Sequence, residues 1–209
     1  IGYASKYDKK DQLDFGFVEF TLGPKTSLAS TGDRWSLKPY LLARHTEVNG
    51  NNFENTWGVG FETTYVPGTS SFFQAAIQKR KLNFHDYTGS GIAPLMGGDE
   101  HRVSVLWGKE IKQGHMLNLS IFARHVDAEV DYFNFDKIDL SARYSIRFDN
   151  IFFKNNIKQS ISFSATRSST DYDAPQFAID PINKRDDNQW RLGISSVIPF
   201  SNRWELYLG

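Results

Sequence analysis

The sequence has no cysteine, and this absence excludes several kinds of site. None of its 209 residues can form a disulfide, a thiolate metal ligand or a cysteine nucleophile. It also has no excess of charge of either sign, because 24 Lys and Arg residues balance 24 Asp and Glu residues. Proteins that bind nucleic acid normally carry a basic excess, so the balanced charge argues against that class.

Long apolar runs are missing as well. No stretch of about 18 apolar residues occurs, so the sequence predicts no transmembrane helix. A transmembrane β-barrel needs no such run, because only alternate residues of each strand face lipid. Aromatic residues make up 15% of the chain, with 17 Phe and 9 Tyr. That content is typical of a barrel whose aromatic side chains gather at the two membrane interfaces.

What the sequence does contain is regular alternation, clearest in residues 137–148, KIDLSARYSIRF. Apolar residues such as Tyr144 occupy one phase, and Arg143 and Arg147 occupy the other. This pattern predicts a strand about 40 Å long with one apolar and one polar face. A strand that crosses a bilayer needs about 9–11 residues, whereas strands of soluble proteins have about 5–6. We interpret it as a transmembrane strand; the alternative is a long strand of a soluble sandwich or lipocalin-like barrel.

Similar segments predict about ten strands in an all-β, antiparallel, up-and-down transmembrane barrel that forms a single domain over residues 1–209. Residues 48–55 are predicted as a Gly/Asn loop. From the third strand on, short connections alternate with long ones: 67–70, 112–115, 149–156 and 200–202 are short, and 85–100, 126–136 and 168–187 are long. Short periplasmic turns and long outer loops are the pattern of bacterial outer-membrane barrels.

Both ends of the sequence predict strands that are incomplete. Residue 1 is Ile rather than Met, and Gly209 falls within an alternating run. An open sheet edge in a bilayer leaves backbone N–H and C=O groups without partners. We therefore expect these residues not to close a barrel by themselves. Strands from the same chain or a neighbouring one would complete an even number, about 12 or 14.

The polar phase of the predicted strands carries the candidate lumen-lining residues. These are Glu62, Arg102, Glu110, Arg124, Asp139, Arg143, Arg147, Lys158, Arg191 and Glu205. Mixed charges on a barrel wall fit a water-filled pore, or ion pairs that brace a narrow barrel. A solvated or braced wall with no role in selectivity is the simpler alternative.

The apolar phase carries aromatic residues close to the predicted strand ends. They are Trp35, Trp57, Tyr65, Phe148, Trp190 and Trp204. Aromatic rings prefer the headgroup zone, so these six are predicted to mark the two membrane interfaces. Packing of the same rings in a soluble core is the alternative.

No catalytic motif stands out, and the sequence predicts no enzyme, no metal site and no cofactor. The five histidines show neither an HExxH motif nor paired ligand spacing. Gly58 and Gly60 lie within a strand, where they predict close packing rather than phosphate binding. Only His85, Asp86 and His101 near the outer rim offer groups that a membrane-embedded protease or phospholipase could use.

The final segment carries a resemblance to a known family. Lys184–Gly209 reads KRDDNQWRLGISSVIPFSNRWELYLG. It resembles the penultimate hairpin of the C-terminal barrels in bacterial outer-membrane proteins of the surface lipoprotein assembly modifier type. Those hairpins have a charged outer rim, a strand, a short turn and an aromatic-led strand. The resemblance implies a membrane barrel used in export or surface display.

Three functions remain open on the sequence alone. The first is an outer-membrane β-barrel that acts as a pore, or as the membrane part of an export or surface-assembly machine. The second is an outer-membrane hydrolase, and the third is a soluble ligand-binding β-barrel. The first predicts a Gram-negative outer membrane as the location. Its expected partners are the lipid bilayer, lipopolysaccharide and further outer-membrane or periplasmic subunits, but no nucleic acid.

Overall fold

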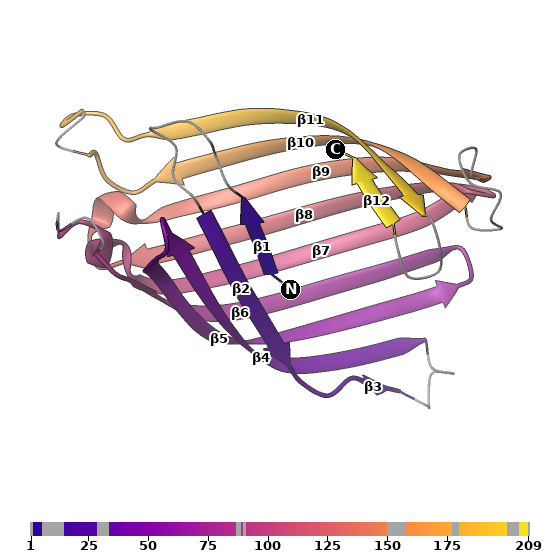
Figure 1. Cartoon of the computed structure of the whole chain (residues 1–209), viewed down its shortest axis with the longest axis horizontal. Helices are drawn as coiled ribbons and strands as arrows, with labels where there is room; N and C mark the ends of the chain where they lie inside the picture. Colours follow the sequence, from indigo (N-terminus) through magenta and orange to yellow (C-terminus); the bar gives the residue numbers. More distant parts are fainter. Residues whose placement is uncertain are drawn as a thin grey trace.

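The chain folds into a single antiparallel β-sheet (Figure 1). A computed structural model describes residues 2–5, 15–28, 34–86, 89, 91–149, 158–176, 180–199 and 205–208. The strands are β1 (Gly2–Ser5), β2 (Phe15–Leu22), β3 (Thr26–Ser27), β4 (Trp35–Val48), β5 (Asn51–Gly68), β6 (Ser71–Phe84), β7 (Gly98–Lys112), β8 (His115–Ala128), β9 (Phe135–Asp149), β10 (Lys158–Tyr172), β11 (Asp186–Pro199) and β12 (Glu205–Leu208). In this described part of the chain, two short 3-10 helices, η2 (Ala93–Met96) and η3 (Asp131–Phe133), lie in the connections. The predicted all-β, up-and-down architecture is confirmed.

Each strand pairs with its neighbours in sequence. The sheet has 12 strands in the order β1-β2-β4-β5-β6-β7-β8-β9-β10-β11-β12, with β3 paired to β4. Leu22 pairs with Leu41, and Thr26 pairs with Leu37 in the same register, so β3 continues the ladder of β2. The strands β4 to β11 have 14 to 18 residues each. They are therefore longer than the minimum of about 9–11 residues that a membrane-spanning strand needs.

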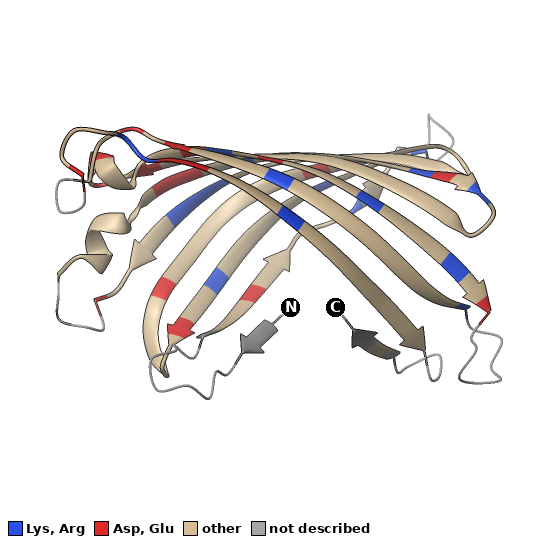
Figure 2. Cartoon of the chain, turned by 90° about the horizontal axis from the view of Figure 1, so that it is seen from above, with Lys and Arg blue, Asp and Glu red and all other residues tan. Residues whose placement is uncertain are grey.

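The sheet is bent into a trough with a concave and a convex face (Figure 2). β1 and β12 are its edge strands, and among the described residues no ladder joins them. The sheet is thus not closed within that part of the chain, as the incomplete strand pattern predicts. No helix in the described part of the chain has the length and apolar character needed to cross a membrane.

The two faces of the trough differ in chemistry. Side chains such as Leu41, Val59, Ile77 and Val103 lie on the convex face and are exposed. The opposite phase carries the charged groups and the best-buried side chains, which include Tyr40, Leu42, Arg80, Leu82, Glu100 and Val126. The alternation predicted for residues 137–148 lies inside β9 and is continuous through its whole length, with no register shift against β8 or β10.

The strands extend further at one end of the trough than the sequence pattern predicts. β8 continues to Ala128 and β9 begins at Phe135, so the predicted loop 126–136 shrinks to 129–134. In the same way the predicted loop 168–187 shrinks to 173–185. Residues on both faces are polar or partly exposed there. The sequence therefore shows no alternation of polar and apolar residues, although the ladder continues. The predicted short connections 149–156 and 200–202 lie almost entirely outside the described residues.

The predicted loop at residues 48–55 is wrong, because these residues form a tight hairpin. β4 ends at Val48 and β5 begins at Asn51, leaving a two-residue turn, Asn49-Gly50. Both residues have positive φ, 52° for Asn49 and 73° for Gly50. Asn-Gly is the preferred sequence for the type I′ turn of a two-residue hairpin. The turn signal was present in the sequence, but the polar residues after it concealed the start of β5.

Replacing Gly50 by Ala should destabilise this hairpin by about 1–2 kcal/mol, since a Cβ is unfavourable at positive φ. Gly68→Ala is the matched control, because an added Cβ there has no heavy atom within 4 Å and the backbone is not in the positive-φ region. Urea unfolding of both variants measures the difference. Equal stability of the two variants would contradict the turn assignment.

Candidate functional site on the concave face

The concave face carries nearly all the residues that the sequence assigns to a lumen. Register pairs such as Arg102–Arg124 and Arg124–Lys137 place them in one phase across β7, β8 and β9. The same phase contains Glu62, Glu110, Asp139, Arg143, Arg147, Lys158 and Arg191. Glu205 lies in β12 opposite Pro199, but its side chain falls outside the described residues.

The aromatic residues predicted at the interfaces lie in the opposite, convex phase. Trp35 and Tyr65 pair across β4 and β5 and stack with ring centroids 4.5 Å apart. Trp57 and Trp190 are more than half exposed, and Phe148 follows the same phase in β9. Trp204 lies outside the described residues. The geometry therefore suits interfacial rings, whose depth in a bilayer stays a prediction.

A cluster of one glutamate and three arginines lies on the concave face; we name it the arginine–glutamate cluster. Glu100 is fully buried, and Arg80, Arg102 and Arg124 surround it. Arg102 Nη2 donates to Glu100 Oε1 at 3.0 Å, and Arg102 Nε lies 2.8 Å from Oε2 outside hydrogen-bond geometry. Arg124 Nε donates to Oε1, and Arg80 Nε lies 3.8 Å from Oε2. One carboxylate thus joins β6, β7 and β8.

The cluster continues across the trough through Arg80. Arg80 Nη1 lies 3.3 Å from Glu19 Oε2, which joins β6 to β2 although β4 and β5 separate these strands in the sheet. Arg80 also donates to Gln78 Oε1 at 2.6 and 2.9 Å, and Gln78 donates to the Tyr40 hydroxyl at 2.7 Å. Because this chain of contacts spans the concavity, it braces the curvature of the sheet.

The glycines of β5 make room for these side chains. A Cβ on Gly60 would lie 2.4 Å from Cζ of Tyr40, and one on Gly58 would lie 3.2 Å from Cγ of Arg80. The prediction that both glycines permit close packing is therefore confirmed. The sequence analysis missed Arg80 and Glu100, because β6 alternates weakly and Glu100 fell in a predicted loop. The positions of these two residues relative to Gly58 and Gly60 are known only once the register between β5 and β6 is known.

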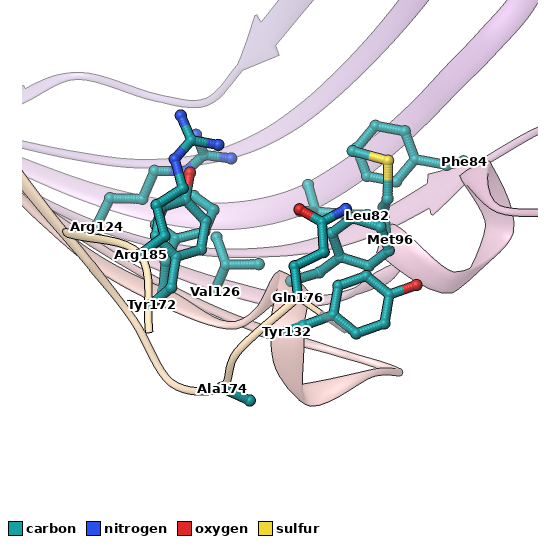
Figure 3. A pocket seen from close by; sticks show the side chains of 12 residues that line it. Leu82, Phe84, Met96, Arg124, Val126, Tyr132, Tyr172, Ala174, Gln176 and Arg185 are labelled. Atoms are coloured by element: carbon teal, nitrogen blue, oxygen red, sulfur yellow. The ribbon is translucent and has the colours of Figure 1, made fainter. Parts of the chain in front are cut away.

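A cavity of about 350 Å³ opens beside the cluster, at the end of the trough where the longer loops lie (Figure 3). We name it the rim pocket. Strands β6, β8, β9 and β10, both 3-10 helices and loop 173–185 contribute to it, through Leu82, Phe84, Met96, Arg124, Val126, Tyr132, Phe133, Phe135, Tyr172, Ala174, Gln176 and Arg185. Aromatic walls beside two guanidinium groups can hold an apolar group next to an anion.

The charges at the mouth of the rim pocket are held in place by short contacts. Arg185 Nε donates to Asp187 at 2.9 Å, and the Arg185 guanidinium lies 5.1 Å from the ring centre of Tyr172. The hydrogen bond to Asp187 raises the pKa of Arg185 above its ordinary value. Backbone and side-chain donors of Ile182 and Asn183 lower the pKa of Asp180 in the same loop. Both groups therefore keep their charge at neutral pH.

The groups that a hydrolase could use, His85, Asp86 and His101, do not come together in the described part of the chain. His85 Nε2 lies 2.9 Å from Asn55 Nδ2, and Asp86 accepts a hydrogen bond from the Gly91 amide. His101 lies beside His125 instead, with ring centroids 6.4 Å apart. The three groups that a hydrolase could use thus make separate contacts. Among the described residues, no group of three or more His, Asp or Glu side chains could hold a metal ion.

His45 and His125 lie on the convex face near the loop-bearing end of the trough. His45 Nδ1 lies 2.7 Å from Asn55 Oδ1, and His125 Nδ1 lies 2.9 Å from Asp136 Oδ1. These polar contacts sit above the exposed apolar side chains of the same face. A polar belt at this level suits a headgroup zone.

In comparisons with known proteins, no family model and no curated protein sequence matches this chain.

Proposed function

We propose that this chain forms the wall of a transmembrane β-barrel in the outer membrane of a Gram-negative bacterium and lines a pore for polar solutes. One observation carries the proposal: large apolar side chains are exposed across the whole convex face. Ile77 is 57% exposed on β6, Ile121 is 53% exposed on β8, and Leu192 is 81% exposed on β11. A soluble sheet of this size would bury such a face against a second layer.

The opposite face supports a water-filled interior. It carries arginines, carboxylates and many hydroxyl groups, and a closed wall of this kind encloses a polar lumen. The cluster around Glu100 and its contact with Glu19 brace that wall. Further strands, from the same chain or from a neighbouring one, complete the barrel in this proposal, since backbone groups at an open edge find no partners in lipid.

The membrane part of an export or surface-assembly machine is a second candidate with the same architecture. It is favoured by the likeness of Lys184–Gly209 to barrel hairpins of the surface lipoprotein assembly modifier type. A machine of this kind would use the rim pocket and the loop end as contact surfaces. The two functions differ in conductance, because an export barrel is held closed until it engages its substrate.

Electrical recording in planar lipid bilayers tests the pore. The purified full-length protein should require detergent to stay in solution and should add stepwise ion conductance when it inserts. Protein boiled in detergent is the control for contaminating channels. A detergent-dependent protein that inserts without conductance would favour the export machine. Monodisperse protein without detergent would refute the membrane barrel.

A further inference from the structure

The middle of the concave face carries an unpaired arginine among neutral hydrogen-bonding side chains. Arg143 of β9 pairs in register with Asn118 of β8 and with Ser164 of β10. We name its surroundings the arginine–hydroxyl strip, which consists of Asn118, Ser120, Ser141, Arg143, Ser145, Ser162, Ser164 and Thr166. Part of the strip lines a hollow of about 390 Å³.

Four of the six hydroxyl groups of the strip are arranged in pairs, and Ser164 Oγ donates to the Gly193 carbonyl at 3.4 Å. Ser141 Oγ lies 2.8 Å from Thr166 Oγ1, and Ser145 Oγ lies 2.8 Å from Ser162 Oγ. Each hydroxyl has one hydrogen to donate. One hydrogen of each pair makes the bond between the two oxygens, so the other can be donated to a solute. The strip therefore offers several neutral donors on both sides of one guanidinium group.

Positive charge on this part of the wall is not balanced. In the described ranges, no carboxylate lies within ion-pair distance of Arg143, Arg147 or Arg191. Arg191 donates to the hydroxyl of Ser168 at 3.2 Å instead.

Two carboxylates on the same face each have a partner through one oxygen. Asp139 Oδ2 lies 3.3 Å from Lys137 Nζ, and Glu110 accepts a hydrogen bond from the Gly114 amide at 2.8 Å. A solute passing along β9 and β10 thus meets hydroxyl donors and guanidinium groups that have no ion-pair partner. The carboxylates of Asp139 and Glu110 are each engaged with a group of the protein.

We propose that the lumen selects anionic solutes, such as carboxylates and phosphates, at the arginine–hydroxyl strip. This inference rests on the proposed pore. A guanidinium group binds oxyanions through parallel N–H donors, and hydroxyls that donate from both sides complete their coordination. Unpaired basic groups on a pore wall also raise the local concentration of anions and lower that of cations.

The reversal potential in a potassium chloride gradient across a planar bilayer tests the selectivity. The full-length protein should pass chloride in preference to potassium. Arg143→Gln should reduce the chloride-to-potassium permeability ratio by at least about fivefold, because a unit charge about 4 Å from the ion path changes the occupancy of chloride about fivefold and acts on potassium with the opposite sign. Arg143→Lys should keep the ratio, and potassium phosphate should reduce the chloride current of the wild type by competing for the strip.

Lys79→Gln is the matched control, because it removes one positive charge from the exposed convex face of β6. It should leave the permeability ratio unchanged. A wild-type ratio at or below one, or the same ratio in Arg143→Gln as in the wild type, would overturn the anion selectivity and leave the pore standing. A complete lack of conductance would remove the pore itself, and the selectivity with it.

Discussion

Ile121→Arg should destabilise the protein in lipid by about 2–4 kcal/mol, the cost of a charged group at the midplane of a transmembrane barrel. Ile121 lies midway along β8 on the convex face, and its partners Val105 and Leu140 are exposed and apolar as well. An arginine at this point therefore has no polar neighbour in either adjacent strand. Urea-dependent unfolding from phospholipid vesicles measures the loss.

Ser120→Arg provides the matched control for this prediction. Ser120 is the preceding residue of the same strand and lies on the concave face, where it lines the hollow beside Arg143. An arginine there can reach water, so its cost should stay well below that of Ile121→Arg. The same loss at both positions would mean that the convex face does not meet lipid. Ile146→Arg and Ile161→Arg, compared with Ser145→Arg, extend the test to β9 and β10.

The sequence predicts the fold well where the environment of the two faces differs. Residues 137–148, where the alternation is clearest, lie within β9, Phe135–Asp149. At the loop-bearing end the faces no longer differ. His125 pairs with Asp136 on the convex face there, while Arg124 lies on the concave face. A strand with polar residues on both faces gives no period-two signal, so residues beyond the apolar zone were assigned to loops.

The arginine–glutamate cluster could not be predicted from the sequence, for a different reason. Its members come from β6, β7 and β8, Arg80 extends the contacts to Glu19 of β2, and these contacts depend on the register of different strands. Period-two alternation assigns a residue to a face but does not say which residue lies beside it. Arg102 and Arg124 were predicted on the inner face from their own strands alone. Glu100, the residue that binds them together, required the alignment of β7 with β8.

Glu100→Gln should destabilise the protein by about 3–5 kcal/mol, because removing one partner of a buried ion pair leaves uncompensated buried charge. Glu100 is fully buried against three arginines, so glutamine keeps the shape of the side chain but removes the charge that balances them. Asp99→Asn is the control on the neighbouring residue. Its carboxylate lies 3.8 Å from Lys81 Nζ with both side chains more than 40% exposed, where a pair contributes about 0–1 kcal/mol.

A double variant separates the loss of charge balance from a general loss of packing. If Arg102 is destabilised by the missing carboxylate, Glu100→Gln combined with Arg102→Gln should cost less than the sum of the two single variants. Side chains that share one ion-pair network typically couple by about 0.5–3 kcal/mol. Arg102→Gln removes one of the three positive charges, so that Arg80 and Arg124 are repelled less once Glu100 no longer balances them. Strictly additive losses, measured by unfolding in vesicles, would mean that Glu100 acts by filling space and that the cluster is not held together by charge.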